Sequence, residues 1–307
     1  MKNILCCISF LCLAHFTFAQ NIPTDTSAPV VAYWRPGDKK TVSITRTVEK
    51  SRAGQRVSFA VNTCEALITV KDSAKEGYTL EWKYTQLGKS EKILQFVPEL
   101  HNLLKNLVIV YKTDDVGNFD RLLNYDEVRK MVDVSFASFT KMANDSSAAF
   151  RSAVKEMAAI FQSRESIEQL VLKDISLFHT PYGIEYTSRK QEQEVELVNF
   201  LGGDPWPAVQ SFQLTSLKPG EDLAGITISQ TIHEEKAAAI LKAFISRIAE
   251  RSGKQIKPGE FPSSISIKDH HEFDIRLSSG WVKRAYQQRM VQTDEQKKTD
   301  TMEIILY

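Results

Sequence analysis

The stretch that decides the fold is residues 78–85, which read YTLEWKYT. Tyr78, Leu80, Trp82 and Tyr84 alternate here with polar residues, so they fall on one side of an extended chain. Alternation with a period of two is typical of a strand that buries one face. We therefore predict a half-buried strand at 78–85 and treat it as the reference for the segments around it.

Similar short runs, separated by turn residues, lie on both sides of this strand. Upstream, an alternating run at 57–61 changes phase to 66–70, which predicts a bulge or bend near residues 62–65. Downstream, the turn at 114–117 predicts a hairpin over 107–122. Further strands are expected at 183–187, 192–200, 209–217 and 223–232, followed by a three-strand meander over 265–277, 281–291 and 299–306.

Helical periodicity appears in separate blocks between these strands. Asn124 and Glu127 predict the start of a helix over 125–142, and Thr231 with Glu234 predicts the cap of another that ends near Gly253. Additional helices are expected at 98–105 and between 146 and 179. This order predicts an α+β fold, a large curved antiparallel sheet of hairpins and meanders with amphipathic helices packed on one face.

The N-terminal segment has the three parts of a secretory signal. Lys2 precedes an apolar run at 4–13, and residues 17–19 supply a small-residue cleavage site. No later segment reaches the roughly 20 uncharged residues that a spanning helix needs. We expect a signal peptide at 1–19, a disordered leader at 20–30 and a single α+β domain at 31–307, with a periplasmic or secreted location. Two similar halves, 31–178 and 179–307, remain an open alternative.

Charge and cysteine content narrow the functional classes. The formal net charge is +1, and the signal segment contains one Lys and no acid, so the remaining chain has no net charge. Nucleic-acid binding is disfavoured because basic residues are interleaved with acids instead of clustered. Three of the four cysteines lie in the signal segment, which leaves Cys64 without an intramolecular partner. We predict that Cys64 is a core residue.

Catalytic motifs are missing from the sequence. It contains no nucleophile elbow, phosphate-binding loop or dinucleotide fingerprint, and we predict no cofactor. His233-Glu234 resembles the start of a zinc-protease helix, but Ala237 stands where the second histidine ligand is needed.

The most polar cluster is residues 269–274, DHHEFD, inside a predicted strand. Alternation places His270, Glu272 and Asp274 on one face and His271 on the opposite, apolar face. These three side chains are candidate metal ligands or acid-base groups. We favour the alternative of a solvated sheet face with alternating charges.

Trp34 and Trp206 are candidate ligand-binding or partner-binding residues. Each lies beside a proline in a predicted loop, where an exposed indole can serve as a recognition surface. The competing interpretation, which we rank first, is that each indole anchors its loop against the domain itself.

Three short segments carry a resemblance. Residues 18–20 (FAQ), 111–124 (YKTDDVGNFDRLLN) and 273–281 (FDIRLSSGW) resemble exported bacterial proteins of about 300 residues without an assigned activity. The resemblance implies an extracytoplasmic location. Its motifs are turns and caps, so it implies no catalytic residue.

These observations lead to three functional hypotheses. The first is a non-enzymatic binding module for a lipid or another apolar ligand in the cell envelope. The second is a structural or interaction protein that contacts an envelope protein. The third, ranked last, is a hydrolase that uses the face of His270.

Overall fold

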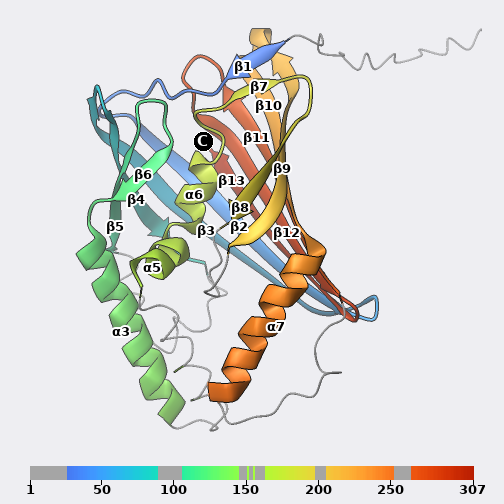
Figure 1. Cartoon of the computed structure of the whole chain (residues 1–307). Helices are drawn as coiled ribbons and strands as arrows, with labels where there is room; N and C mark the ends of the chain where they lie inside the picture. Colours follow the sequence, from blue (N-terminus) through green and yellow to red (C-terminus); the bar gives the residue numbers. More distant parts are fainter. Residues whose placement is uncertain are drawn as a thin grey trace, which may run out of the picture.

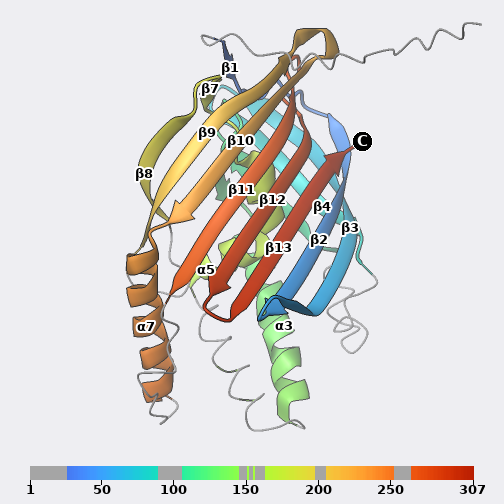
Figure 2. The same cartoon turned by 90° about the vertical axis from the view of Figure 1, so that its right-hand side faces the viewer.

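The computed structural model describes residues 26–88, 106–144, 151, 155, 163–197, 205–251 and 264–307. The described chain is dominated by an eleven-stranded sheet, curved and antiparallel throughout (Figures 1 and 2). Its strands, in spatial order, are β6 (Phe119–Leu122), β5 (Val108–Thr113), β4 (Gly77–Gln86), β3 (Gln55–Ala74), β2 (Lys39–Arg52), β13 (Gln296–Leu306), β12 (Val282–Thr293), β11 (Ile265–Arg276), β10 (Leu223–Ile232), β9 (Trp206–Lys218) and β8 (Gln191–Leu197). The predicted large curved antiparallel sheet is confirmed.

Two meanders build this sheet, β2–β6 and β8–β13, and each places consecutive strands side by side. They join where β2 pairs with β13, from Val42 opposite Leu306 to Arg52 opposite Gln296. The sheet is therefore continuous between the two halves of the chain.

The hairpin between β2 and β3 shows how local sequence sets the register. Ala53 and Gly54 both have positive φ, 49° and 78°, and Arg52 pairs with Gln55 across them. Two consecutive residues with positive φ make the tight turn that matches the twist of a hairpin. Beside β2, β3 shifts register once, where Lys50 pairs with Ser58 and Ser51 with Arg56, and it then runs without a shift through residues 58–69. Against β4 it shifts between Glu65 and Ala66 and again between Val70 and Asp72.

That register corrects one sequence expectation. Val57, Phe59 and Val61 do not enter the core: all three are exposed, and the pairing with β2 puts Phe59 and Val61 on the opposite face from Cys64 and Ala66. Alternation identifies two faces of a strand but does not say which one is buried. Cys64 itself is buried and free, as predicted.

Four described helices accompany the sheet: α3 (Tyr125–Asn144), α5 (Arg164–Val171), α6 (Lys173–His179) and α7 (Glu234–Arg251). Helix α6 lies inside the curve of the sheet and packs on β12, whereas α7 packs on β9 and β11 (Figure 1). Helix α7 begins after His233, whose carbonyl accepts from the amide of Ala237, so the predicted cap at Thr231 is wrong because Thr231 still belongs to β10. The helix expected at 98–105 and most of the segment 146–162 lie outside the described residues.

The N-terminal boundary of the domain also differs from the expectation. Residues 1–25 lie outside the described part of the chain. β1 (Ser27–Pro29), however, pairs with β7 (Glu185–Thr187), and Ala28 and Val30 are buried. The predicted disordered leader therefore does not extend to residue 30, because this segment gains a strand partner that is distant in sequence.

An aromatic cluster fills the space between α6 and the concave face. Phe178 of α6 contacts Trp82 and Trp281, with ring centroids 6.0 and 6.3 Å apart. His179 is buried, its Nδ1 2.8 Å from the Gly117 carbonyl and its Nε2 2.9 Å from the Tyr111 hydroxyl. These contacts hold the end of α6 against the sheet.

Candidate functional site

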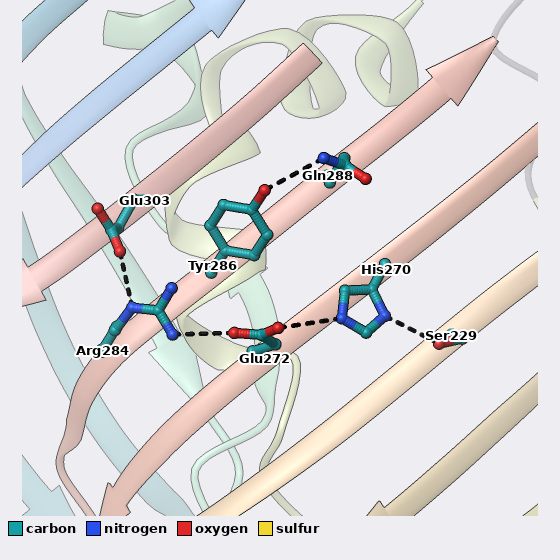
Figure 3. Close-up of polar contacts among 7 residues, drawn as sticks. All are labelled: Ser229, His270, Glu272, Arg284, Tyr286, Gln288 and Glu303. Carbon is teal, nitrogen blue, oxygen red and sulfur yellow. Dashed lines mark hydrogen bonds and ion pairs between the residues drawn. The ribbon is translucent and has the colours of Figure 1, made fainter. Parts of the chain in front are cut away.

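The predicted polar face of β11 exists and lies on the outer side of the sheet, away from the helices (Figure 3). His270 Nε2 lies 3.2 Å from Glu272 Oε1, and its Nδ1 lies 3.2 Å from the hydroxyl of Ser229 on β10. Arg284 of β12 donates to Glu272 (3.0 Å) and to Glu303 of β13 (2.7 Å). The network therefore links four neighbouring strands.

The chemistry of this outer face is that of a fixed ion-pair chain. The hydrogen bond from Arg284 lowers the pKa of Glu272, with a smaller contribution from His270, which makes Glu272 a poor proton acceptor. Asp274 shares the face, but no group of three or more His, Cys, Asp or Glu side chains in the described residues is placed to hold a metal ion. A hydrolase would need a recess here, whereas Figure 3 shows the side chains spread along the strands.

The two predicted tryptophans are both buried. Trp34 packs against Trp281 and Tyr78, with ring centroids 4.9 and 5.1 Å away. Trp206 is the first residue of β9, not a loop residue, and joins an apolar cluster with Ile232 and Ile265. Neither indole presents the exposed surface that a recognition platform would need, because tertiary packing covers both.

The concave face, which the sequence did not single out as a site, has three bands. Its upper apolar band, under α6, is almost completely buried. This band includes Val42, Ile44, Ala66, Ile68, Ile226, Phe273, Ala285 and Ile304. Such a band is what a packed sheet interior requires.

A row of polar side chains crosses the concave face below that band. The register brings six of them into consecutive partner positions on β8 to β13, and we call them the polar row: Gln193, Gln210, Gln230, Asp269, Arg289 and Asp300. The only sequence signal is a polar residue at an inward position of each strand. These positions line up only through the register of the strands, which the sequence alone does not specify.

The centre of the polar row is a buried ion pair. Arg289 donates to both oxygens of Asp269, at 2.7 and 2.6 Å, and the Asp269 side chain is only 2% exposed. These hydrogen bonds raise the pKa of Arg289, so the guanidinium stays charged. Bidentate geometry of this kind compensates the loss of solvation of the carboxylate.

A second buried carboxylate reaches the concave face from α6. Asp174 accepts from Arg46 of β2 and from the hydroxyl of Tyr84, the latter at 2.6 Å. Burial, followed by the charge of Asp174, raises the pKa of Tyr84, so the phenol stays a donor. This contact fixes the start of α6 over the strands.

Two polar side chains of this region lack such partners. His271 lies on the concave face two residues from Asp269, is buried, and has no hydrogen-bond partner for either ring nitrogen among the described residues. Burial lowers its pKa to about 4, so it is neutral at pH 7. Lys173 is exposed to solvent and forms no ion pair with the described residues. Partial burial lowers its pKa, while the nearby Asp300 has the opposite effect.

Below the polar row the concave face becomes apolar again. We call this the lower apolar band: Val195, Leu197, Trp206, Ala208, Ile232, Ile265, Ile267 and Val291. The first turns of α7 pack on it through Ala237, Ile240 and Leu241. Several members, among them Ile267 and Val291, are only partly buried, as are Phe244 and Ile245 one turn further along α7.

Comparison with known proteins gives little guidance. No family model matches the chain, and no curated protein sequence matches it. A solved structure described as "Lipid-protein interactions in lipovitellin" aligns with 89% of this chain at 8% identity and a TM-score of 0.45. An outer membrane channel from Pseudomonas putida F1 aligns with 90% of this chain and 98% of its own at 7% identity and a TM-score of 0.14. The chain covers 25% of the lipovitellin chain, and neither likeness is strong enough to carry an argument.

In the described residues, no helix is long and apolar enough to cross a membrane.

Proposed function

We propose that this protein is a non-enzymatic binding module for a lipid or another apolar ligand, held against the lower apolar band. The observation that carries the proposal is the incomplete burial of this band, which contrasts with the almost completely buried upper band of the same face.

The geometry of the lower apolar band suits an apolar guest. Apolar side chains of the concave sheet and of α7 meet along one continuous surface, and Ile267, Val291, Ile240 and Leu241 each retain solvent contact. Covering apolar surface is favourable by about 25 cal/mol per Å². Ligand sites in proteins are typically concave, mostly apolar and bordered by a few polar groups. The polar row supplies that border.

The location proposed for this activity is the cell envelope or the space outside it. It follows from the signal-like segment at residues 1–19. A module that holds a lipid between membranes, or carries it away from one, needs the apolar face and no catalytic group.

Apolar-probe binding tests the proposal directly. The purified protein is extracted with organic solvent, refolded and titrated with the neutral fluorophore Nile red, while native mass spectrometry of the unextracted protein looks for a retained lipid. Val291→Asn introduces an amide into the lower apolar band and is expected to weaken Nile red binding roughly fivefold, from a loss of about 1 kcal/mol of apolar contact. Met290→Asn, on the outer face of the same strand, is the control and is expected to leave the affinity unchanged. Equal effects of the two substitutions, or no binding by the parent protein, would refute the proposal.

A second function, contact with an envelope protein, is favoured by one separate observation. Val57, Phe59 and Val61 form an outward stripe on β3 and are 63%, 53% and 43% exposed. Large apolar side chains grouped on a surface often mark a contact site. Crosslinking in cells from residue 59 would support this function if it captured the same protein repeatedly, and the loss of that product in Phe59→Ser would confirm the site.

A further inference from the structure

The charges around the polar row do not balance. Three ion pairs are complete: Arg289 with Asp269, Arg46 with Asp174, and Lys298 with Asp300 at 2.7 Å. Lys173 lies close enough to Asp300, Arg289 and Arg46 to interact with them electrostatically, but it has no carboxylate of its own among the described residues. The described part of the concave face therefore carries cations that its ion pairs do not neutralise, Lys173 and also Lys50, which lies opposite Lys298.

An independent observation points to the same place. Asp269 and His271 are successive residues of β11 on the concave face. Both ring nitrogens of His271 are buried without a hydrogen-bond partner in the described structure. More than nine in ten buried polar groups in folded proteins are paired, so the unpaired ring nitrogens of His271, one of which is a donor in the neutral ring, indicate a missing polar partner.

We propose, building on the lipid-binding function above, that the ligand is amphipathic with one anionic head group, and that this head group binds at the polar row through Lys173 and Arg289. Its chain then extends along the lower apolar band, which begins at Val291, the next concave-face residue of β12 after Arg289. Lys173 supplies the unpaired charge. Arg289 supplies the guanidinium donors that its two bonds to Asp269 leave over.

The charges near the polar row determine the head group of the proposed ligand, and the lower apolar band determines its chain. A neutral apolar molecule would leave the ammonium of Lys173 without an anion at the border of the band. A cationic head group would meet like charge from Lys173, Arg46 and Arg289. Long-chain carboxylates and alkyl phosphate monoesters share the required chemistry, so the experiment contains both.

Competition against Nile red tests the inference. Dodecanoate, dodecyl phosphate and uncharged dodecanol, each below its critical micelle concentration, are compared as competitors on the full-length mature protein. Preference for the anionic head group is expected to be roughly tenfold over dodecanol, the effect of one charge-assisted hydrogen bond. The preferred anion then identifies the head group as carboxylate or phosphate.

Variants at two lysines assign the effect to the polar row. Lys173→Gln is expected to abolish the preference and leave dodecanol affinity unchanged, and Lys173→Arg is expected to retain it. Lys283→Gln is the matched control, since Lys283 is an exposed lysine of β12 at the register shift near the start of the strand, away from the polar row. Unfolding curves of all variants exclude a loss of fold as the cause.

Failure of the inference and failure of the proposed function give different results. If dodecanol competes as well as both anions, or if Lys173→Gln keeps the full preference, the head-group inference is wrong and the apolar site stands. If neither Nile red nor any competitor binds the parent protein, the proposed function is wrong and the inference falls with it.

Discussion

Removing Arg289 should reveal how strongly the polar row is held together. Arg289→Met keeps most of the apolar stem but takes away the guanidinium that meets both oxygens of Asp269. The carboxylate is 2% exposed and would remain buried without a cation, a situation that typically costs 3–5 kcal/mol. Because the Arg289 side chain is 39% exposed, solvent reaches this side of the pair, and we expect the lower end, about 3 kcal/mol.

The double variant Arg289→Met/Asp269→Leu separates the pair from the orphaned charge. With both partners replaced by apolar groups, no buried carboxylate is left, and the cost should fall to about 1 kcal/mol or less. Arg284→Met is the matched control on the outer face of the same strand. Its partners Glu272 and Glu303 keep solvent contact, so the expected cost is below about 1 kcal/mol.

Equilibrium unfolding in urea measures these differences from the shift in midpoint at constant slope. The reasoning would be refuted if Arg289→Met cost no more than Arg284→Met. It would also be refuted if the double variant were as unstable as Arg289→Met, since the penalty would then not come from the orphaned carboxylate.

Three further predictions concern the buried histidines, the buried Trp34 and the turn at Gly280. The pKa values of His179 and His271 are lowered to about 4 by burial, so the unfolded chain binds their protons first. Stability should therefore be full above pH 6.5 and fall between pH 6.5 and 4, by up to about 1.4 kcal/mol per pH unit for each histidine, and His271→Leu should reduce this slope in unfolding curves recorded across that range. Trp34→Ala should cost about 3–5 kcal/mol in urea unfolding, whereas Tyr33→Ala, at a neighbouring side chain that is 57% exposed, should cost about 0.5 kcal/mol or less. Gly280→Ala should lower the melting temperature measured by circular dichroism, because φ is +69° and a Cβ atom would lie 2.0 Å from the Val31 carbonyl oxygen; an unchanged melting temperature would contradict the turn geometry.

The local sequence pattern was sufficient to predict most of the strands. The alternation at 78–85 identified β4 and its buried face, and Leu80 and Trp82 are completely buried. The turn at 114–117 identified the hairpin of β5 and β6, where Asp114 Oδ1 accepts from the amides of Val116, Gly117 and Asn118. These features depend on residues that are close in sequence.

Other features depended on contacts that sequence alone does not specify. Trp34 lies in a loop, as predicted, but Trp281, almost 250 positions away in the chain, covers its indole. Thr231 has the chemistry of a helix cap, yet pairing with Lys268 keeps it in β10. In each case a distant partner overrode the local preference.

The polar row is the clearest example of this limit. Its six members come from six strands between Gln193 and Asp300, and only the register places them side by side. The sequence did place His271 on the inward face of β11. It gave no sign that Asp269, Arg289 and Asp300 lie on one row beside it.

The polar residues on the concave face differ in whether the stability of the sheet explains their presence. Inward ion pairs such as Arg289 with Asp269 have an architectural explanation, because a slipped register would bury each charge opposite an apolar residue. His271 has no such explanation: neither of its ring nitrogens has a partner in the described chain, and an apolar residue at position 271 would avoid their desolvation. A polar molecule bound at the polar row would supply the missing partner, and the exposed ammonium of Lys173 on α6 would favour an anionic one.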